Sequence, residues 1–175
     1  MFDRDLIQQL EDILGRPLDP LPEERFERHT QANDARGGAK QDRITRDAYA
    51  LAEDGTVSGL FLAPVTSHIL LDFPFQEFRH LKYLCLRQVN VSSFEWVREL
   101  TGLTTLDLSS NRISDGDFLR ELTGLTTLDL SDNSISDGDF LRELTGLTTL
   151  DLSNNNIQAI PKELAEGRLA ITTEG

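Results

Sequence analysis

The side chains best suited to catalysis or metal binding are few in this sequence, and they are scattered. His29, His68, His80 and the single cysteine, Cys85, are separated by intervals that match no zinc-ligand spacing. No histidine and acidic pair of the hydrolase kind stands near Cys85, so we expect an ordinary exposed or half-covered thiol. The sequence therefore predicts no enzyme activity, no metal and no cofactor.

Two Asp-Gly-Asp triplets, at residues 115–117 and 137–139, could suggest a calcium site. The spacing of an EF-hand loop is absent, however, and no glutamate closes either loop at the right distance. Turns that cap a short helix, with Ser114 or Asp115 as the capping residue, explain these triplets better.

The elements that position these residues are set by an internal repeat of 22 residues. Residues 100–121 read LTGLTTLDLSSNRISDGDFLRE, and residues 122–143 differ from them only at Asp132 in place of Ser110 and Ser134 in place of Arg112. A third copy begins at residue 144 as LTGLTTLDLSNNNI and then diverges. A repeat of this length predicts a stack of similar units that share one core.

Within each copy, apolar residues and one asparagine recur at fixed places. They are Leu103, Leu106, Leu108, Asn111 and Ile113; Leu125, Leu128, Leu130, Asn133 and Ile135; and Leu147, Leu150, Leu152, Asn155 and Ile157. The pattern L-x-x-L-x-L-x-x-N-x-L resembles that of the leucine-rich repeat family. Two degenerate copies precede these three, with Val65 and Val89 in place of the asparagine, so the resemblance covers residues 48–165.

This resemblance implies an α/β solenoid that winds as a right-handed superhelix. It places a short parallel sheet on the concave face and short helices or turns on the convex face. The leucines of each short strand point into the core, and the asparagines can form a ladder of hydrogen bonds in the turns. Trp96, Phe118 and Phe140 share one repeat position and predict a buried aromatic row on the convex side.

The chain divides into four predicted parts, which are a cap at 1–47, a hairpin with a degenerate repeat at 48–77, repeats at 78–165 and a strand or tail at 166–175. The cap combines an amphipathic helix over 5–14 with a polar loop over 16–43, and Asp54-Gly55 predicts the hairpin. This layout resembles the start of bacterial Roco-type leucine-rich repeat proteins, many of which continue into a GTPase. Since G-x-x-x-x-G-K-[ST] is absent, GTPase activity is not carried over.

Composition narrows the partners and the compartment. The 175 residues carry a formal net charge of −13, which repels nucleic acid phosphates and anionic membranes. Neither a signal peptide nor an apolar run long enough to cross a membrane is visible, so we expect a cytoplasmic protein.

The outward side chains of the sheet are the candidate partner-binding residues. In the three regular repeats they include Thr105 and Asp107, Thr127 and Asp129, and Thr149 and Asp151. The aspartates predict an acidic strip for a basic protein surface, and a solvated polar sheet face is the alternative. The degenerate repeats add Phe61, Tyr83 and Arg87 as a possible hot spot, unless the N-terminal cap folds over them.

Three functions remain open at this stage. The first is a non-catalytic scaffold that binds a protein partner through the concave face. The second is the N-terminal sensor or regulatory segment of a larger Roco-like GTPase or other signalling enzyme, which a phosphate-binding loop downstream in the gene would indicate. The third is a structural spacer. We also expect some self-association through the C-terminal edge, because the last repeat lacks a clear polar cap.

Overall fold

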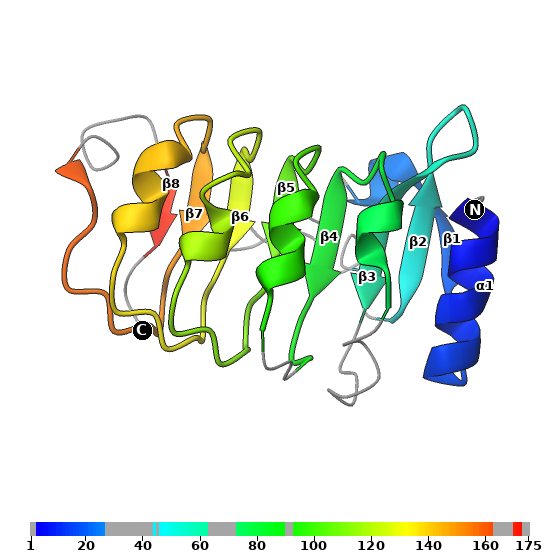
Figure 1. Ribbon diagram of the computed structural model, residues 1–175, viewed down its shortest axis with the longest axis horizontal. Helices are drawn as coiled ribbons and strands as arrows, with labels where there is room; N and C mark the ends of the chain where they lie inside the picture. Colours follow the sequence, from blue (N-terminus) through cyan, green and yellow to red (C-terminus); the bar gives the residue numbers. More distant parts are fainter. Residues whose placement is uncertain are drawn as a thin grey trace.

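A computed structural model describes residues 3–26, 44, 46–62, 73–89, 93–162 and 170–172. One eight-stranded sheet runs the length of the molecule, with its strands in chain order (Figure 1). The strands are β1 (Asp19–Pro22), β2 (Ala48–Leu51), β3 (Val57–Leu62), β4 (Tyr83–Leu86), β5 (Thr105–Asp107), β6 (Thr127–Asp129), β7 (Thr149–Asp151) and β8 (Ala170–Thr172). The helices are α1 (Asp3–Leu14) and the short 3-10 helices η3 (Phe75–Glu77), η4 (Glu95–Glu99), η5 (Asp117–Leu119) and η6 (Asp139–Glu143).

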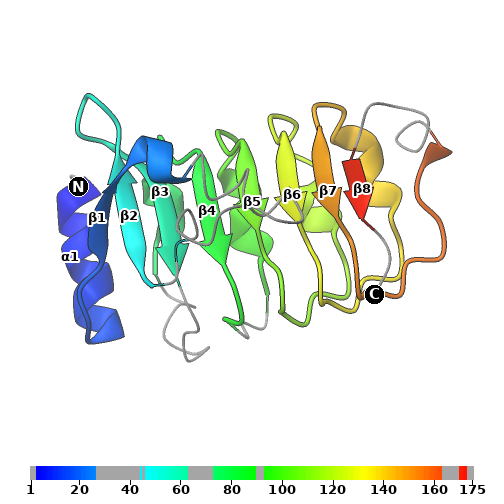
Figure 2. The same cartoon turned by 180° about the vertical axis from the view of Figure 1, so that it is seen from behind.

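The sheet is parallel except at one hairpin. β2 and β3 are antiparallel around the turn at Gly55, whose φ of 84° suits glycine, and every later neighbour pair is parallel. The sheet forms one face of the molecule and the 3-10 helices lie on the opposite face (Figures 1 and 2). This arrangement confirms the predicted α/β solenoid with an N-terminal helix and hairpin.

Leucines fill the space between the sheet and the 3-10 helices. Leu106, Leu128 and Leu150 are in register on adjacent strands, and all three are fully buried. Each repeat buries its leucines against those of its neighbours, so the stack has one continuous core. A single repeat could not bury this surface alone.

The predicted asparagine ladder is present. The side-chain oxygen of Asn111 accepts a hydrogen bond from the backbone N–H of Val89, and Asn133 and Asn155 accept from the next two turns in the same way. Val89 has no side-chain amide, but its backbone N–H donates a hydrogen bond to Asn111 of the following repeat. Val65, the other replacement, lies outside the described residues.

The N-terminal cap differs from the prediction in two adjacent segments of the expected loop, the strand β1 and the helical turn at residues 23–26 that follows it. The helix forms as expected, begins at Asp3 and buries Leu6 and Leu10 against the end of the core. The loop prediction is wrong over Asp19–Pro22, which is a strand that pairs with β2. Its two prolines are tolerated because β1 is an edge strand, where a missing N–H leaves no partner unpaired.

On the convex side the predicted capping turns form. The Oδ1 atoms of Asp115 and Asp137 accept the backbone N–H two residues ahead, at 2.8 and 2.9 Å. Phe118 and Phe140 are buried as predicted. Trp96, predicted to be buried with them, is only half-buried, and its ring stacks on that of Phe75 at a centroid distance of 4.5 Å.

At the C-terminal end, β8 pairs with β7 so that Ile171 is in register with Leu150. Of the two forms predicted for residues 166–175, a strand is therefore present at Ala170–Thr172.

Candidate functional site

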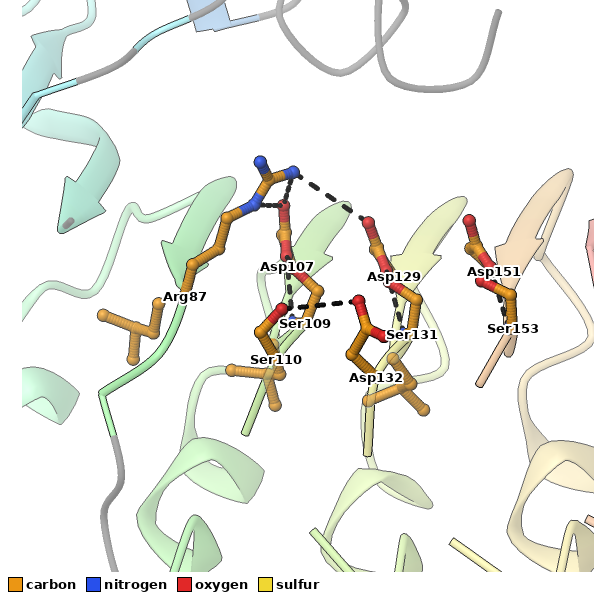
Figure 3. Close-up of polar contacts among 12 residues, drawn as sticks. Arg87, Asp107, Ser109, Ser110, Asp129, Ser131, Asp132, Asp151 and Ser153 are labelled. Carbon is orange, nitrogen blue, oxygen red and sulfur yellow. Dashed lines mark hydrogen bonds and ion pairs between the residues drawn. The ribbon is translucent and has the colours of Figure 1, made fainter. Parts of the chain in front are cut away.

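Three aspartates form a row across the sheet face that points away from the core. Asp107, Asp129 and Asp151 are in register on β5, β6 and β7, about 5 Å from strand to strand (Figure 3). The Oδ1 of each accepts the backbone N–H of the serine two residues later, at 2.9–3.0 Å. This local bond fixes each carboxylate at the end of its strand, so the spacing of the row follows from the spacing of the strands.

Arg87 lies at one end of the row and neutralises part of it. Its Nε and Nη2 atoms are 2.6 and 2.5 Å from Oδ2 of Asp107, and Nη2 is 3.9 Å from Oδ2 of Asp129 (Figure 3). Within the described part of the chain, no cationic side chain forms an ion pair with Asp151. Among the described residues, the negative charge of the row is therefore compensated at the Asp107 end and not toward Asp151.

The crowding of carboxylates changes the acidity of the middle one. Burial, followed by the negative charge of Asp107, raises the pKa of Asp129 to about 6, against the opposing hydrogen bonds from Ser131. Asp151 adds a smaller contribution in the same direction. Ionisation of Asp129 thus costs stability at neutral pH, first because its charge is buried and then because Asp107 repels it, and a cation bound there would lower this cost.

We expect the Asp129→Asn variant to be more stable than the wild type at pH 7 by about 2 kcal/mol. The side chain of Asp129 is only 20% exposed, so solvent screens little of the repulsion. Because the folded pKa lies above the unfolded value, the destabilisation is absent below about pH 4, grows between about pH 4 and 6, and is constant at higher pH.

Urea unfolding at pH 4, 5, 6 and 7 measures this difference. Asp139→Asn, on the exposed convex side, serves as the control for the loss of one carboxylate. If the difference in unfolding free energy between the wild type and Asp129→Asn stays constant from pH 4 to 7, the raised pKa of Asp129 is contradicted.

The N-terminal half of this face is covered. Phe61 is 4% exposed and packs with Phe26 and Cys85, while Tyr83 is half-buried with its ring 6.3 Å from that of Phe26. The cap therefore covers Phe61 and packs against Tyr83, and Phe61 is left out of the surface proposed below. Arg87 remains 32% exposed beside the aspartates.

Cys85 differs from the expectation of an exposed or half-covered thiol. It is buried, and burial raises the pKa of its thiol well above the ordinary value, with the negative charge of Asp107 acting in the same direction. A thiol in this state is a poor nucleophile.

A second row of residues lies beside the aspartates and was missed by sequence reasoning. Gln88, Ser110, Asp132 and Asn154 each have a φ of 53–57°, which is unusual for residues other than glycine. Asn154 donates a hydrogen bond of 2.8 Å to Asp132, and Ser110 lies 3.5 Å from the other carboxylate oxygen of Asp132. The sequence did mark this position, because Ser110 and Asp132 are one of the two differences between the first two regular repeats.

Other parts of the described chain offer weaker candidates. No group of three metal-ligating side chains converges within the residues that can be described. A shallow groove of about 490 Å³ near the hairpin turn is lined by His80 and by charged groups of both signs, including Arg79 and Asp54. His29 and His68 lie outside the described residues. Nothing in the helices that can be described is long and apolar enough to cross a membrane.

Two stretches of the regular repeats match models of known protein families. Residues 123–166 match the family model described as Leucine Rich repeats (2 copies), and residues 100–117 match the model described as Leucine Rich repeat. A search of curated proteins found no match.

Several solved structures are similar to the chain. An internalin (inlF) from Listeria monocytogenes is 29% identical with a TM-score of 0.54, over 64% of this chain and 32% of that one. The leucine-rich repeat protein LIC12759 from Leptospira interrogans is 26% identical with a TM-score of 0.56, over 67% and 31%. An internalin C2 (inlC2) from L. monocytogenes shares the fold at 19% identity and a TM-score of 0.53, over 76% and 70%. The chain thus spans about a third of the length of the first two proteins.

Proposed function

We propose that this leucine-rich repeat protein is a non-catalytic module that binds a basic segment of a protein partner on the open sheet face of β5–β7. The observation that carries the proposal is the row of three in-register carboxylates with the guanidinium of Arg87 at one end. Leucine-rich repeats commonly mediate protein–protein interactions, and the excess of negative charge selects the chemistry of the partner.

Arg87 indicates how a partner's arginine would be held. Its guanidinium contacts Asp107 closely and Asp129 at longer range. Arg87 directly follows β4, the strand next to the one that carries Asp107. Because Asp151 repeats the position of Asp129 one strand further on, the step from Asp129 to Asp151 offers a second guanidinium the same pair of acceptors. A partner arginine placed there would neutralise the part of the row that Arg87 does not reach.

The neighbouring side chains suit a polar contact. Thr127 and Thr149 flank the aspartates on the same face and are half-buried, whereas Thr105 and Asp107 are buried. We therefore place the partner mainly over β6 and β7, with Arg87 at its border. The net charge of −13 would also accelerate the approach of a basic segment and make it dependent on salt.

A labelled peptide of alternating arginine and glycine residues tests this proposal by fluorescence anisotropy. We expect the double variant Asp129→Asn with Asp151→Asn to bind it at least about tenfold more weakly than the wild type. The matched control is Asp117→Asn with Asp139→Asn, which removes two charges from the convex face, where both residues are highly exposed.

Both double variants change the net charge from −13 to −11, so they separate position from total charge. The control should bind within about twofold of the wild type, because long-range attraction is screened at physiological salt. Equal losses in the two variants would mean that the peptide reads only the overall charge, and the proposed surface would be abandoned.

A further inference from the structure

The two oxygen atoms of the Asp129 carboxylate have different surroundings. Oδ1 accepts two hydrogen bonds from Ser131, one from its backbone N–H at 3.0 Å and one from its hydroxyl group at 2.6 Å. Oδ2 points toward Arg87, whose Nη2 atom is 3.9 Å away and so beyond hydrogen-bond distance (Figure 3). Because two donors already occupy Oδ1, Oδ2 is the oxygen that can take a proton or a further hydrogen bond.

The two outer carboxylates of the row differ from the middle one. The Oδ2 atom of Asp107 is in close contact with the guanidinium of Arg87. Asp151 is in register with Asp129 on one side and with the neutral Thr172 of β8 on the other. Among the described residues, Asp129 is therefore the carboxylate that has a negative neighbour on each side and no close cation.

Within the described part of the chain, the titratable and charged groups that face Asp129 come from the strands on both sides of it. They are Asp107 from β5, Asp151 from β7, Cys85 from β4 and Arg87, which directly follows β4. Burial, followed by the charge of Asp107, raises the pKa of Asp129 to about 6. The thiol of Cys85 stays neutral at this pH, because burial raises its pKa well above the ordinary value. Asp129 therefore changes its charge in the range between pH 5 and 7.

A proton and a guanidinium need the same oxygen of this carboxylate. A guanidinium carries N–H donors and no acceptor, so it binds Oδ2 only while that oxygen is an acceptor. A proton on Oδ2 turns the acceptor into a donor and removes the negative charge. An arginine placed between Asp129 and Asp151 would then lose one of its two acceptors and meet an O–H group in its place.

We propose that a proton on Oδ2 of Asp129 and an arginine of the basic partner segment exclude each other, so that this surface releases its partner as the pH falls from 7 to 5. The inference rests on the function proposed above, because the arginine is that of the proposed partner. Arg87 takes no part in the exchange, since its close contact is with Asp107. By linkage, binding of the partner must in turn expel the proton from Asp129.

Fluorescence anisotropy with the arginine–glycine peptide tests the inference at constant ionic strength. The ends of the peptide are blocked and its dye is insensitive to pH, so the peptide itself does not titrate in this range. We expect the Kd of the wild type to rise about tenfold from pH 7 to pH 5, because the ionised fraction of a carboxyl group with a pKa of about 6 falls from about 90% to about 10%. Circular dichroism at both pH values checks that the fold is retained.

Asp129→Asn imitates the protonated carboxyl group in size and in charge. Its Kd at pH 7 should resemble that of the wild type at pH 5, and it should change by less than about twofold between the two pH values. Asp139→Asn is the matched control, because it removes one carboxylate from the exposed convex side and should keep the pH dependence of the wild type.

Calorimetry at pH 6 in two buffers with different ionisation enthalpies gives a second readout. Binding should release about half a proton per peptide from the wild type and none from Asp129→Asn. Equal affinity of the wild type at pH 5 and 7, or a pH dependence that persists in Asp129→Asn, would overturn the inference and leave the docking surface in place. Absence of peptide binding at both pH values would overturn the proposed function as well.

Discussion

Replacing Asn133 by alanine is expected to lower the free energy of unfolding by about 3 to 5 kcal/mol. Its side-chain N–H groups donate to the carbonyl oxygens of Leu108, Leu130 and Ser131, and its oxygen accepts the N–H of Ile113 at 3.0 Å. The residue is 9% exposed, so water would not replace these bonds. Alanine would leave backbone groups of two successive repeats unpaired inside the turn.

Urea unfolding followed by circular dichroism measures this loss. Asn156→Ala is the control, because Asn156 is exposed and its backbone N–H, which bonds to Ile135, is unaffected by the change. Asn133→Asp adds a sharper test, since it keeps the size but presents an oxygen to three carbonyl oxygens, and it should be at least as unstable as the alanine variant. A loss below about 1 kcal/mol for Asn133→Ala would show that the ladder is not a main source of stability.

The regular repeats could be predicted in detail from the sequence, whereas the cap could not. Leu106, Leu128 and Leu150 recur with a fixed period, and the same local pattern fixes strand, turn and core in each copy. β1 has no such pattern, because its prolines and polar residues are typical of a loop. It becomes a strand only because the edge of β2 is available to it, which is a tertiary effect that a local pattern does not carry.

The candidate site could likewise be predicted only in part. The outward position of Asp107, Asp129 and Asp151 follows from the alternation of side chains in a strand, and sequence reasoning found it. The ion pair of Arg87 with Asp107 joins neighbouring repeats across 20 residues, and the outward position of both side chains could be read from the repeat pattern. The coverage of Phe61 by Phe26 could only be named as an alternative, because the two residues are separated by the whole polar segment of the cap.

Replacing Gly116 by alanine is expected to destabilise the fold by about 2 to 3 kcal/mol, although the backbone there is ordinary, with a φ of −103°. The cause is steric, because a Cβ at this position would lie 2.4–2.6 Å from three ring atoms of Phe140, the aromatic residue of the next repeat. That ring is 2% exposed and packed in the core, so it has no open space into which to turn. In the preceding repeat Phe94 holds the equivalent position, and its ring stacks on Phe118 at 6.1 Å instead.

Thermal and urea unfolding of Gly116→Ala and Gly124→Ala separates this clash from the general effect of adding a methyl group. A Cβ on Gly124 would meet no atom closer than the Leu103 carbonyl oxygen at 3.5 Å. If the clash is the cause, shortening the ring by Phe140→Leu should cost less in the Gly116→Ala background than in the wild type, which gives a favourable coupling of about 1 kcal/mol. If the stability losses of the two single variants simply add in the double variant, contact with the Phe140 ring is not the cause of the destabilisation. A measured coupling would instead show that the glycine of the first Asp-Gly-Asp triplet is required by the aromatic ring of the following repeat, whereas a Cβ on Gly138 of the second triplet would meet the backbone oxygen of Ala159 at 3.0 Å.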